Sequence, residues 1–437
     1  MGISRASTPS VIQIRVLLLI LALFFVDGMD TQMVAVALPA LIADWATPAS
    51  RFALALAIGH VGAGLGAPIG GVLGDRIGRK RTIIIGALLF GFVSVFLALI
   101  TSVNELVVLR FVAGLGLGGC IPPAITLLTE RFSTGRRGTV VGLALLCTLI
   151  GVAAVGFLAA AVMPLYGWRT LFVIAGLLPI GLAVAMMPLL PESTSFLERI
   201  SPAAHASAQR HSPGSTVSPP SARASGSWLE IFREMRSLGV AKAASFLCVS
   251  FAFTYVAMSF VLTWLPTLLS SEGFSLRVAS SALSVWSIAG MAGTFIAGWA
   301  VGKIGWLRTT TGLACCAMGG ALLLALSAPR PSDGSIAIIT LYGLLAITGC
   351  MLNGLITALY AAATYVFPTA VRSTGVGTAA MAGRIGAISG ALLGVRALKL
   401  DGLTGFFLAT AAVLLIAALS LRTTGRAHAA EPHHEEG

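Results

Sequence analysis

Charged residues are scarce in this chain. Lys, Arg, Asp and Glu make up 10% of its 437 residues, whereas soluble domains carry about 25%. Hydrophobic residues make up 57%. A soluble protein with so few charges would expose apolar patches larger than soluble monomers tolerate. The composition therefore excludes an ordinary soluble domain and indicates a protein surrounded mainly by the lipid bilayer.

Cysteine, histidine and acidic residues are also few. The sequence has six Cys, six His and 16 Asp plus Glu, and the cysteines lack the spacing of metal ligands. We therefore predict no metal site and no bound cofactor, and we interpret the cysteines as small packing residues. The sequence also has no pairing of a nucleophile with a base and no long soluble domain, so it does not predict an enzyme or a receptor.

Long hydrophobic runs dominate the rest of the chain. A helix needs about 20 apolar residues to cross a bilayer, and twelve segments meet this criterion. They lie at about 16–40, 53–74, 82–101, 106–128, 138–163, 169–190, 244–269, 278–301, 309–328, 336–364, 374–396 and 402–421. We therefore expect an all-α integral membrane protein with twelve transmembrane helices.

Basic residues are distributed unevenly between the segments that join these runs. The formal net charge is +12, which in a soluble protein would suggest a nucleic-acid partner. If the N-terminus lies inside, 20 of the 28 Lys and Arg residues fall on the cytoplasmic side and six on the opposite side. This is the positive-inside bias of membrane proteins. It predicts that both termini are cytoplasmic and that no nucleic acid is bound.

Two segments are repeated at about half the length of the chain. Gly71–Arg81 reappears in degenerate form as Gly298–Arg308, 227 positions later. Phe132–Gly142 is similar to Phe367–Gly377, at an offset of 235. Because all four segments lie between hydrophobic runs, the repeat indicates two related, pseudo-symmetric membrane bundles. Such duplication is typical of transporters.

The hydrophobic pattern is interrupted once, between the two halves. The interruption is rich in Ser, Pro, Ala and His, too polar to form a core, which predicts a linker that is partly disordered. We therefore predict a six-helix bundle over 1–191, a cytoplasmic linker over 192–243, a second six-helix bundle over 244–421 and a cytoplasmic tail over 422–437.

Two acidic residues lie inside the first hydrophobic run. Asp27 and Asp30 are three residues apart and so share a face of the helix. A carboxylate at this depth is costly unless it is paired, protonated or hydrated, and the pair is suited to binding and releasing a proton. Arg110, about one turn inside the fourth run, is the predicted partner of one of them. The alternatives are a structural salt bridge for the acids and snorkelling to the headgroups for Arg110.

A second intramembrane arginine lies in the eleventh run. Arg384 is about eleven residues from either end of this run, too deep for comfortable snorkelling. Because a guanidinium binds a carboxylate through two parallel hydrogen bonds, we predict that Arg384 binds an anionic substrate; pairing with a fixed acid is the alternative. Further candidates for the substrate site are Tyr255, Trp264, Asn353 and Tyr360, although Trp and Tyr also gather at membrane interfaces for other reasons.

The repeated loops are candidates for a gate. Asp75 can cap a neighbouring helix and hold the basic residues that follow it, but Gly302 replaces it in the second copy. At the end of the fourth run, Glu130 can bridge to one of the arginines. The predicted gating residues are Asp75, Arg76, Gly78, Arg79, Lys80, Glu130, Arg137 and Arg372. The alternative is that the basic residues serve topology alone.

The glycine-rich loop with its Asp-Arg and Arg-Lys-Arg pairs, its degenerate copy and the six-plus-six layout resemble the major facilitator superfamily. Within it, the sequences Asp27-Gly-Met-Asp30, Trp264-Leu-Pro266, Asn353-Gly354 and Gly383-Arg384-Ile-Gly386 resemble the aromatic acid/proton symporters of bacteria. This resemblance implies the facilitator fold and proton-coupled uptake through Asp27 and Asp30. It also implies gating by Asp75 and Arg79, and a place for Arg384 near the substrate path.

The predicted function is therefore secondary active transport in the bacterial inner membrane. The substrate would be an aromatic carboxylate of the benzoate, hydroxybenzoate or phenylpropionate type, imported with protons by alternating access. We expect the protein to act as a monomer. The alternative is proton-coupled efflux, or uptake of another small organic anion or a drug, by the same fold. The fifth run lacks the Gly-Pro signature of drug/proton antiporters, which favours symport.

Overall fold

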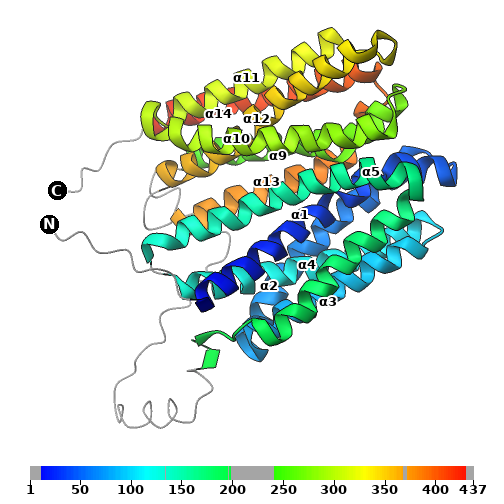
Figure 1. Cartoon of the computed structure of the whole chain (residues 1–437). Coiled ribbons are helices and arrows are strands. Elements are labelled where there is room, and N and C mark those ends of the chain that lie inside the picture. The colour runs from blue at the N-terminus through cyan, green and yellow to red at the C-terminus, as the bar shows by residue number, and fades with distance from the viewer. Residues whose placement is uncertain (1–10, 133, 195, 198–240, 368–371, 430–437) are drawn as a thin grey trace, which may run out of the picture. The chain divides into compact units, whose positions relative to one another are not determined.

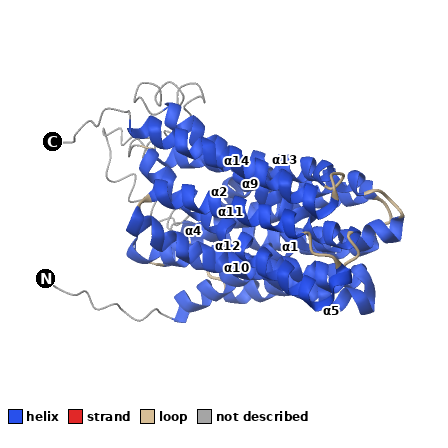
Figure 2. Ribbon diagram, turned by 90° about the horizontal axis from the view of Figure 1, so that it is seen from above, coloured by secondary structure: helices blue, strands red, loops and turns tan. Residues whose placement is uncertain are grey.

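The computed structural model describes residues 11–132, 134–194, 196–197, 241–367 and 372–429, and this part of the chain is helical, without strands (Figures 1 and 2). The α-helices are α1 (Val11–Trp45), α2 (Ala53–Ile77), α3 (Arg79–Phe96), α4 (Val103–Arg131), α5 (Thr134–Leu189), α9 (Ala241–Ser271), α10 (Leu276–Ile304), α11 (Trp306–Ser327), α12 (Gly334–Val366), α13 (Arg372–Ala397) and α14 (Gly402–Ala429). Three short 3₁₀ helices lie between them: η1 (Ala49–Phe52), η2 (Leu97–Leu99) and η3 (Pro331–Asp333).

The long helices match the predicted membrane spans. Eleven helices in the described residues are long and apolar enough to cross a membrane. The longest, α5, has 56 residues and loses helical geometry at Gly167, where φ is 75° and two helices meet. Its two arms fall on the predicted spans 138–163 and 169–190. Each of the twelve predicted spans therefore falls on a helix or one arm of a helix, within a few residues, and the predicted all-α membrane fold is confirmed.

The described residues divide into two compact units. The first takes its residues from 1–33, 58–152 and 168–217, and the second takes its residues from 34–57, 153–167 and 218–437. Both α1 and α5 thus contribute to each unit. The predicted domain boundaries at 191 and 244 remain a prediction. Residues 198–240, which include most of the predicted linker, lie outside the described residues.

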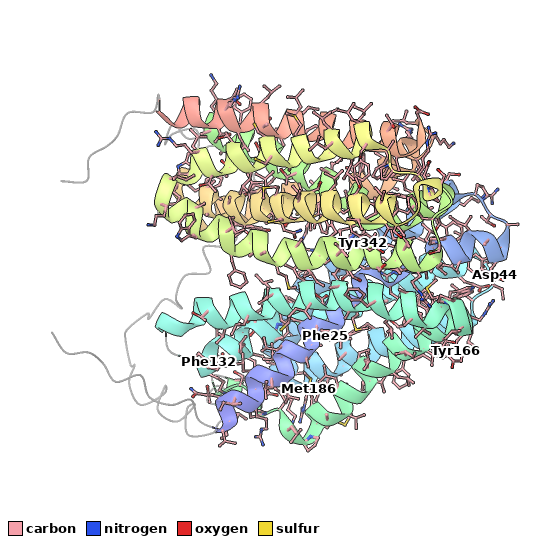
Figure 3. All side chains as sticks on the ribbon, turned by 45° about the horizontal axis from the view of Figure 1, so that its top comes forward. Phe25, Asp44, Phe132, Tyr166, Met186 and Tyr342 are labelled. Atoms are coloured by element: carbon pink, nitrogen blue, oxygen red, sulfur yellow. The ribbon has the colours of Figure 1, made fainter. Side chains whose placement is uncertain are left out.

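In the first unit, an apolar cluster and close helix crossings hold the helices together. Buried side chains of α1, α3, α4 and α5 form one cluster, which includes Phe132 and Met186 (Figure 3). Gly62, Gly66 and Gly70 of α2 face α4, and a Cβ at any of the three would overlap a backbone carbonyl oxygen of α4. Small residues at four-residue spacing allow such close approach between membrane helices.

In the second unit, α10 packs on α12 and α9 packs on α13. The backbones again meet at glycines. A Cβ at Gly293 of α10 would overlap the Cys350 carbonyl of α12, and one at Gly386 of α13 would overlap the Ala252 carbonyl of α9. Between α10 and α12, the hydroxyls of Ser281 and Tyr342 lie 2.5 Å apart (Tyr342 is labelled in Figure 3). These contacts set the positions of the polar side chains described below.

The internal repeat is visible in the backbone. Gly78 joins α2 to α3 with φ 103° and ψ 148°, and Gly305 joins α10 to α11 with φ 84° and ψ 158°. These left-handed values favour glycine. The two glycines are 227 positions apart, and each carbonyl accepts a threonine hydroxyl four residues on: Thr82 at 2.9 Å and Thr309 at 2.8 Å. The sequence repeat is therefore also a repeat of local structure.

Candidate functional site

A buried ion pair lies within the first unit. The Arg110 Nη1 of α4 is 3.1 Å from the Asp30 Oδ2 of α1, and it also donates to the Asp30 backbone carbonyl at 3.3 Å. Asp30 is 4% exposed and Arg110 7%. The other carboxylate oxygen, Oδ1, accepts a hydrogen bond of 3.0 Å from the Ser94 hydroxyl of α3. Three helices thus meet at one carboxylate, and Arg110 faces an acid rather than the headgroups.

The guanidinium of Arg110 lies against the backbone of α2. A Cβ at Gly59 would be 3.4 Å from Arg110 Nη2 and 3.6 Å from Nε, so a side chain longer than methyl would take space that the guanidinium occupies. The Nε atom is buried and has no hydrogen-bond partner in the described residues. A buried pair of this kind is costly to form, and removal of one partner leaves an uncompensated charge.

Asp27 has different neighbours from Asp30 although the two share a helix. It is half-buried, and the hydroxyl of Thr148 on α5 lies 3.5 Å from its Oδ2. Here α1 and α5 cross closely, because a Cβ at Gly28 would overlap the Thr148 carbonyl and one at Gly151 would overlap the Phe25 carbonyl. The two acids therefore contact different helices.

A second charged group, the Arg79 cluster, comprises Asp75, Arg79, Glu130, Glu192 and Ser193 of the first unit. Arg79 pairs with Glu130 through Nη1 and also donates to the Ser193 hydroxyl at 3.0 Å. That hydroxyl in turn donates to Glu130 Oε2 at 2.7 Å. Asp75 is more remote, at 3.8 Å from Arg79 Nη2, and its side chain is 63% exposed. Glu130 rather than Asp75 is thus the main partner of Arg79.

Glu192 completes this cluster through the backbone. Its Oε1 accepts the N–H of Lys80 at 3.0 Å and the N–H of Ser193 at 2.9 Å. A Cβ at Gly78 would overlap its Oε2. The carboxylate therefore lies at the N-terminus of α3, where the helix dipole favours an anion.

The other predicted gating residues are less informative. Arg76 is exposed, and Lys80 takes part in the cluster through its backbone N–H. The side chains of Arg137 and Arg372 lie outside the described residues. In the second copy, a Cβ at Gly302 or Gly305 would meet open space, so no described residue covers that turn as Glu192 covers the first.

In the second unit, polar groups of three helices gather near Arg384. The hydroxyls of Tyr255 on α9 and Tyr360 on α12 are 3.4 Å apart, and the ring of Tyr255 lies over Gly383 of α13. The positive charge of Arg384 interacts electrostatically with the Tyr255 hydroxyl. Arg384 is exposed in the middle of α13, and its guanidinium has no ion-pair partner in the described residues. Two hydroxyls and one cation are thus available to an anionic ligand.

The two remaining substrate candidates are engaged in packing. Trp264 is fully buried and its indole N–H donates to the Ala391 carbonyl at 3.0 Å. The amide of Asn353 donates to the Gly349 carbonyl at 3.0 Å and lies against Gly290, where a Cβ would overlap Nδ2. Both side chains join helices of the second unit in this conformation.

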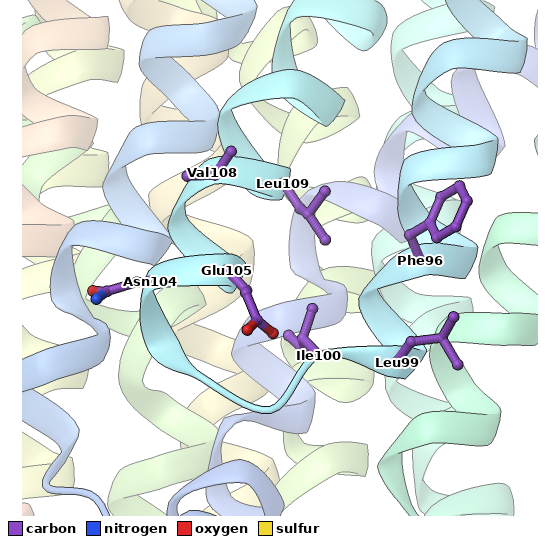
Figure 4. Close-up of a pocket in the computed structure, with 7 residues that line it drawn as sticks. All are labelled: Phe96, Leu99, Ile100, Asn104, Glu105, Val108 and Leu109. Carbon is purple, nitrogen blue, oxygen red and sulfur yellow. The ribbon is translucent and has the colours of Figure 1, made fainter.

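A pocket of about 510 Å³ lies where α3 ends and α4 begins (Figure 4). It is lined by Phe96, Leu99, Ile100, Asn104, Glu105, Val108 and Leu109. The Glu105 carboxylate accepts the N–H of Thr101, which precedes α4, at 2.9 Å, and the Ser102 hydroxyl caps the helix by accepting the Glu105 N–H. None of the lining residues belongs to the predicted sites, and within the described residues no group of three His, Cys, Asp or Glu could hold a metal ion.

Three contact residues were missed by sequence reasoning: Gly59, Ser94 and Thr148. A signal existed for one of them, because Ser94 is the only hydrogen-bonding side chain between Thr82 and the end of α3. A lone polar residue in an apolar membrane helix often faces another polar group. The other two are common small residues without a distinguishing pattern.

The chain is similar in sequence and fold to known transporters. Residues 20–346 match the family model described as Major Facilitator Superfamily. The chain is 31% identical over 424 residues to a gallate transporter of Pseudomonas putida, which covers 95% of this chain and 92% of that protein. It is 32% identical over 442 residues to a 4-hydroxybenzoate transporter of Pseudomonas aeruginosa, with 94% of each covered. The crystal structure of a D-xylose–proton symporter has a TM-score of 0.71 at 19% identity and covers 93% of this chain and 97% of its own.

Proposed function

The chain belongs to the major facilitator superfamily and is a multi-pass membrane transporter rather than an enzyme; from this premise we propose that it imports an aromatic carboxylate together with protons. The two curated relatives described above carry gallate and 4-hydroxybenzoate according to their names. Both compounds combine a carboxylate with a hydroxylated ring. The proposed substrate class is therefore a small, hydroxylated aromatic acid.

The exposed guanidinium of Arg384 is the observation that carries this proposal. A cation in the middle of a membrane helix is costly unless it has a partner or faces water, and the described residues provide no ion-pair partner for it. A carboxylate substrate would supply that partner through bidentate hydrogen bonds. The hydroxyls of Tyr255 and Tyr360 are close enough together to donate to the same anion or to a ring hydroxyl.

Proton coupling is assigned to Asp27, Asp30 and Arg110. A protonated Asp30 no longer neutralises Arg110, so a proton bound there changes the charge balance of a buried site. Asp27 is less enclosed than Asp30 and can exchange protons with water more readily. On this account one or both acids take up a proton before the substrate crosses and release it afterwards.

Gating is assigned to the Arg79 cluster. Its ion pair between Arg79 and Glu130 joins α3 to α4, and Glu192 and Ser193 tie both to the segment that follows α5. The side chains of this pair are 15% and 19% exposed, so it costs less to break than a fully buried pair. We place this cluster on the cytoplasmic side of the bacterial inner membrane, with both termini in the cytoplasm and the monomer as the functional form.

The decisive experiment compares variants of two arginines on one helix. Uptake of radiolabelled benzoate, 4-hydroxybenzoate, gallate and 3-phenylpropionate would be measured in proteoliposomes with an imposed inward proton gradient. Arg384→Gln should raise the KM for the transported acid at least tenfold, because a charge-assisted bidentate contact is lost. The matched control, Arg396→Gln near the end of the same helix, should transport as the wild type does.

Three results would contradict the proposal or a part of it. If no acid accumulates in wild-type vesicles under a verified gradient, the aromatic-acid assignment is wrong. If a gradient with an acidic interior instead drives labelled compounds into inverted vesicles, the direction is efflux. An unchanged KM in Arg384→Gln would remove this residue from the substrate site.

A further inference from the structure

The hydroxyl of Ser94 contacts the carboxylate of Asp30, one of the groups to which we assign proton coupling. Ser94 is completely buried in α3, and its hydroxyl donates to Asp30 Oδ1 on α1, 64 positions away, at 3.0 Å. Hydroxyls in helices commonly bond instead to the carbonyl one turn earlier on their own helix. Thr348 and Thr410 do so in this protein, at 2.8 Å and 3.0 Å. Ser259 and Ser284 donate to backbone carbonyls of other helices, whereas the buried hydroxyl of Ser94 donates to a carboxylate.

The carboxylate of Asp30 has two kinds of hydrogen-bond donor, and they differ in what they can do after protonation. Arg110 binds Oδ2 as a permanent donor, because a guanidinium has no acceptor. A serine hydroxyl can donate and can also accept when it rotates. Of these two donors, only Ser94 can therefore accept a hydrogen bond from the O–H of the neutral acid, whereas Arg110 can donate only to the oxygen that carries no proton.

We propose that Ser94 is a positioning residue for proton transfer at Asp30, an inference that rests on the proposed proton coupling. In the charged state it donates to Oδ1 and shares the anion with Arg110. When a hydronium ion transfers a proton to Oδ1 and leaves water behind, the Ser94 hydroxyl turns and its oxygen accepts a hydrogen bond from the new O–H group. The neutral acid thus stays in place while its electrostatic attraction to Arg110 weakens. When the O–H bond at Oδ1 breaks, the proton returns to a water molecule.

Several charged or titratable groups lie near Asp30 and Arg110, and each could contribute to a titration measured on the whole protein. Arg110 of α4 is the cation in contact with Asp30, and Asp27 lies one turn away on α1. On α2, Gly59 contacts the guanidinium and His60 follows it in the chain. Cys120 of α4 has an electrostatic interaction with Asp27. Assignment of a titration to Asp30 therefore requires a variant that removes this one carboxyl group.

Infrared difference spectroscopy on the purified protein provides that assignment without a substrate. The carboxylic acid C=O band that appears on acidification and is missing in Asp30→Asn belongs to Asp30. In Ser94→Ala, the charged carboxylate loses a donor, so we expect the midpoint of this band to move to higher pH by about one unit. The band should also move to higher frequency, because the neutral acid loses its hydrogen-bond partner.

Two variants test whether the effect requires the hydroxyl at this position. Ser94→Thr keeps the hydroxyl and should restore the wild-type midpoint. Thr410→Val removes a buried hydroxyl that bonds only within α14 and should leave the band unchanged. An Asp30 band that titrates identically in wild type and Ser94→Ala would overturn the proposal, as would a shift of equal size in Thr410→Val.

The same spectra separate this inference from the proposed function. If Ser94→Ala shifts the band but no aromatic acid is transported by the wild type, the role of Ser94 stands and the substrate assignment fails. If transport is driven by protons but the Asp30 band never appears over the working pH range, proton coupling uses another group and the role of Ser94 is wrong.

Discussion

At the scale of single residues, the sequence predicted the chemistry of the buried charges better than their neighbours. The depth of Arg110 and the spacing of Asp27 and Asp30 led to an expected pairing, and the structure places Arg110 against Asp30. Sequence could not choose between the two acids, because the choice depends on how α1 faces α3 and α4. In the Arg79 cluster, Glu130 is the closer partner of Arg79 and Asp75 is largely exposed, so the gating role of Asp75 stays a prediction.

A prediction at this scale concerns the cost of an unpaired charge. Arg110→Ala leaves the Asp30 carboxylate buried without its cation, which should destabilise the protein by about 3–5 kcal/mol. The double variant Asp30→Asn/Arg110→Gln removes both charges and should lose considerably less. Thermal unfolding in detergent, followed by the loss of helical circular dichroism, compares the two. A double variant less stable than Arg110→Ala would contradict the structural reading of this pair.

At the scale of the helices, hydropathy located the spans because a bilayer requires long apolar segments with satisfied backbone groups. It did not show how the helices approach one another. In the structure, the glycine row of α2 packs closely against α4. The kink at Gly167 in α5 joins two predicted spans in one element. A positive φ at a single glycine leaves little trace in an apolar sequence.

Two adjacent glycines of α2 give a prediction at this scale. In Gly70→Ala the new methyl would overlap the Gly119 carbonyl of α4, whereas a Cβ at Gly71 has no neighbour within 4 Å. Gly70→Ala should therefore lower stability by about 1–3 kcal/mol. Gly71→Ala should be neutral or slightly stabilising, because alanine favours the helix. Equal thermal stability of the two variants would contradict the close crossing of α2 and α4.

At the scale of the whole molecule, the internal repeat was the strongest signal in the sequence. It indicated two related membrane bundles, and the equivalent turns at Gly78 and Gly305 share their backbone conformation and their threonine caps. Among the described residues the charges around these turns do not repeat, since Glu192 covers the first turn and no described side chain covers the second. The repeat therefore preserves the fold, while the Arg79 cluster belongs to one copy.

Coupled movement of protons and substrate is the central claim at this scale. The most direct measurement is the pH of the medium when gallate or 4-hydroxybenzoate is added to weakly buffered proteoliposomes without an imposed gradient. Symport predicts a transient rise in external pH as protons enter with the acid. It should be absent in protein-free liposomes and reduced in Arg384→Gln. Entry of the labelled acid without any change in external pH, or external acidification, would contradict proton-coupled import.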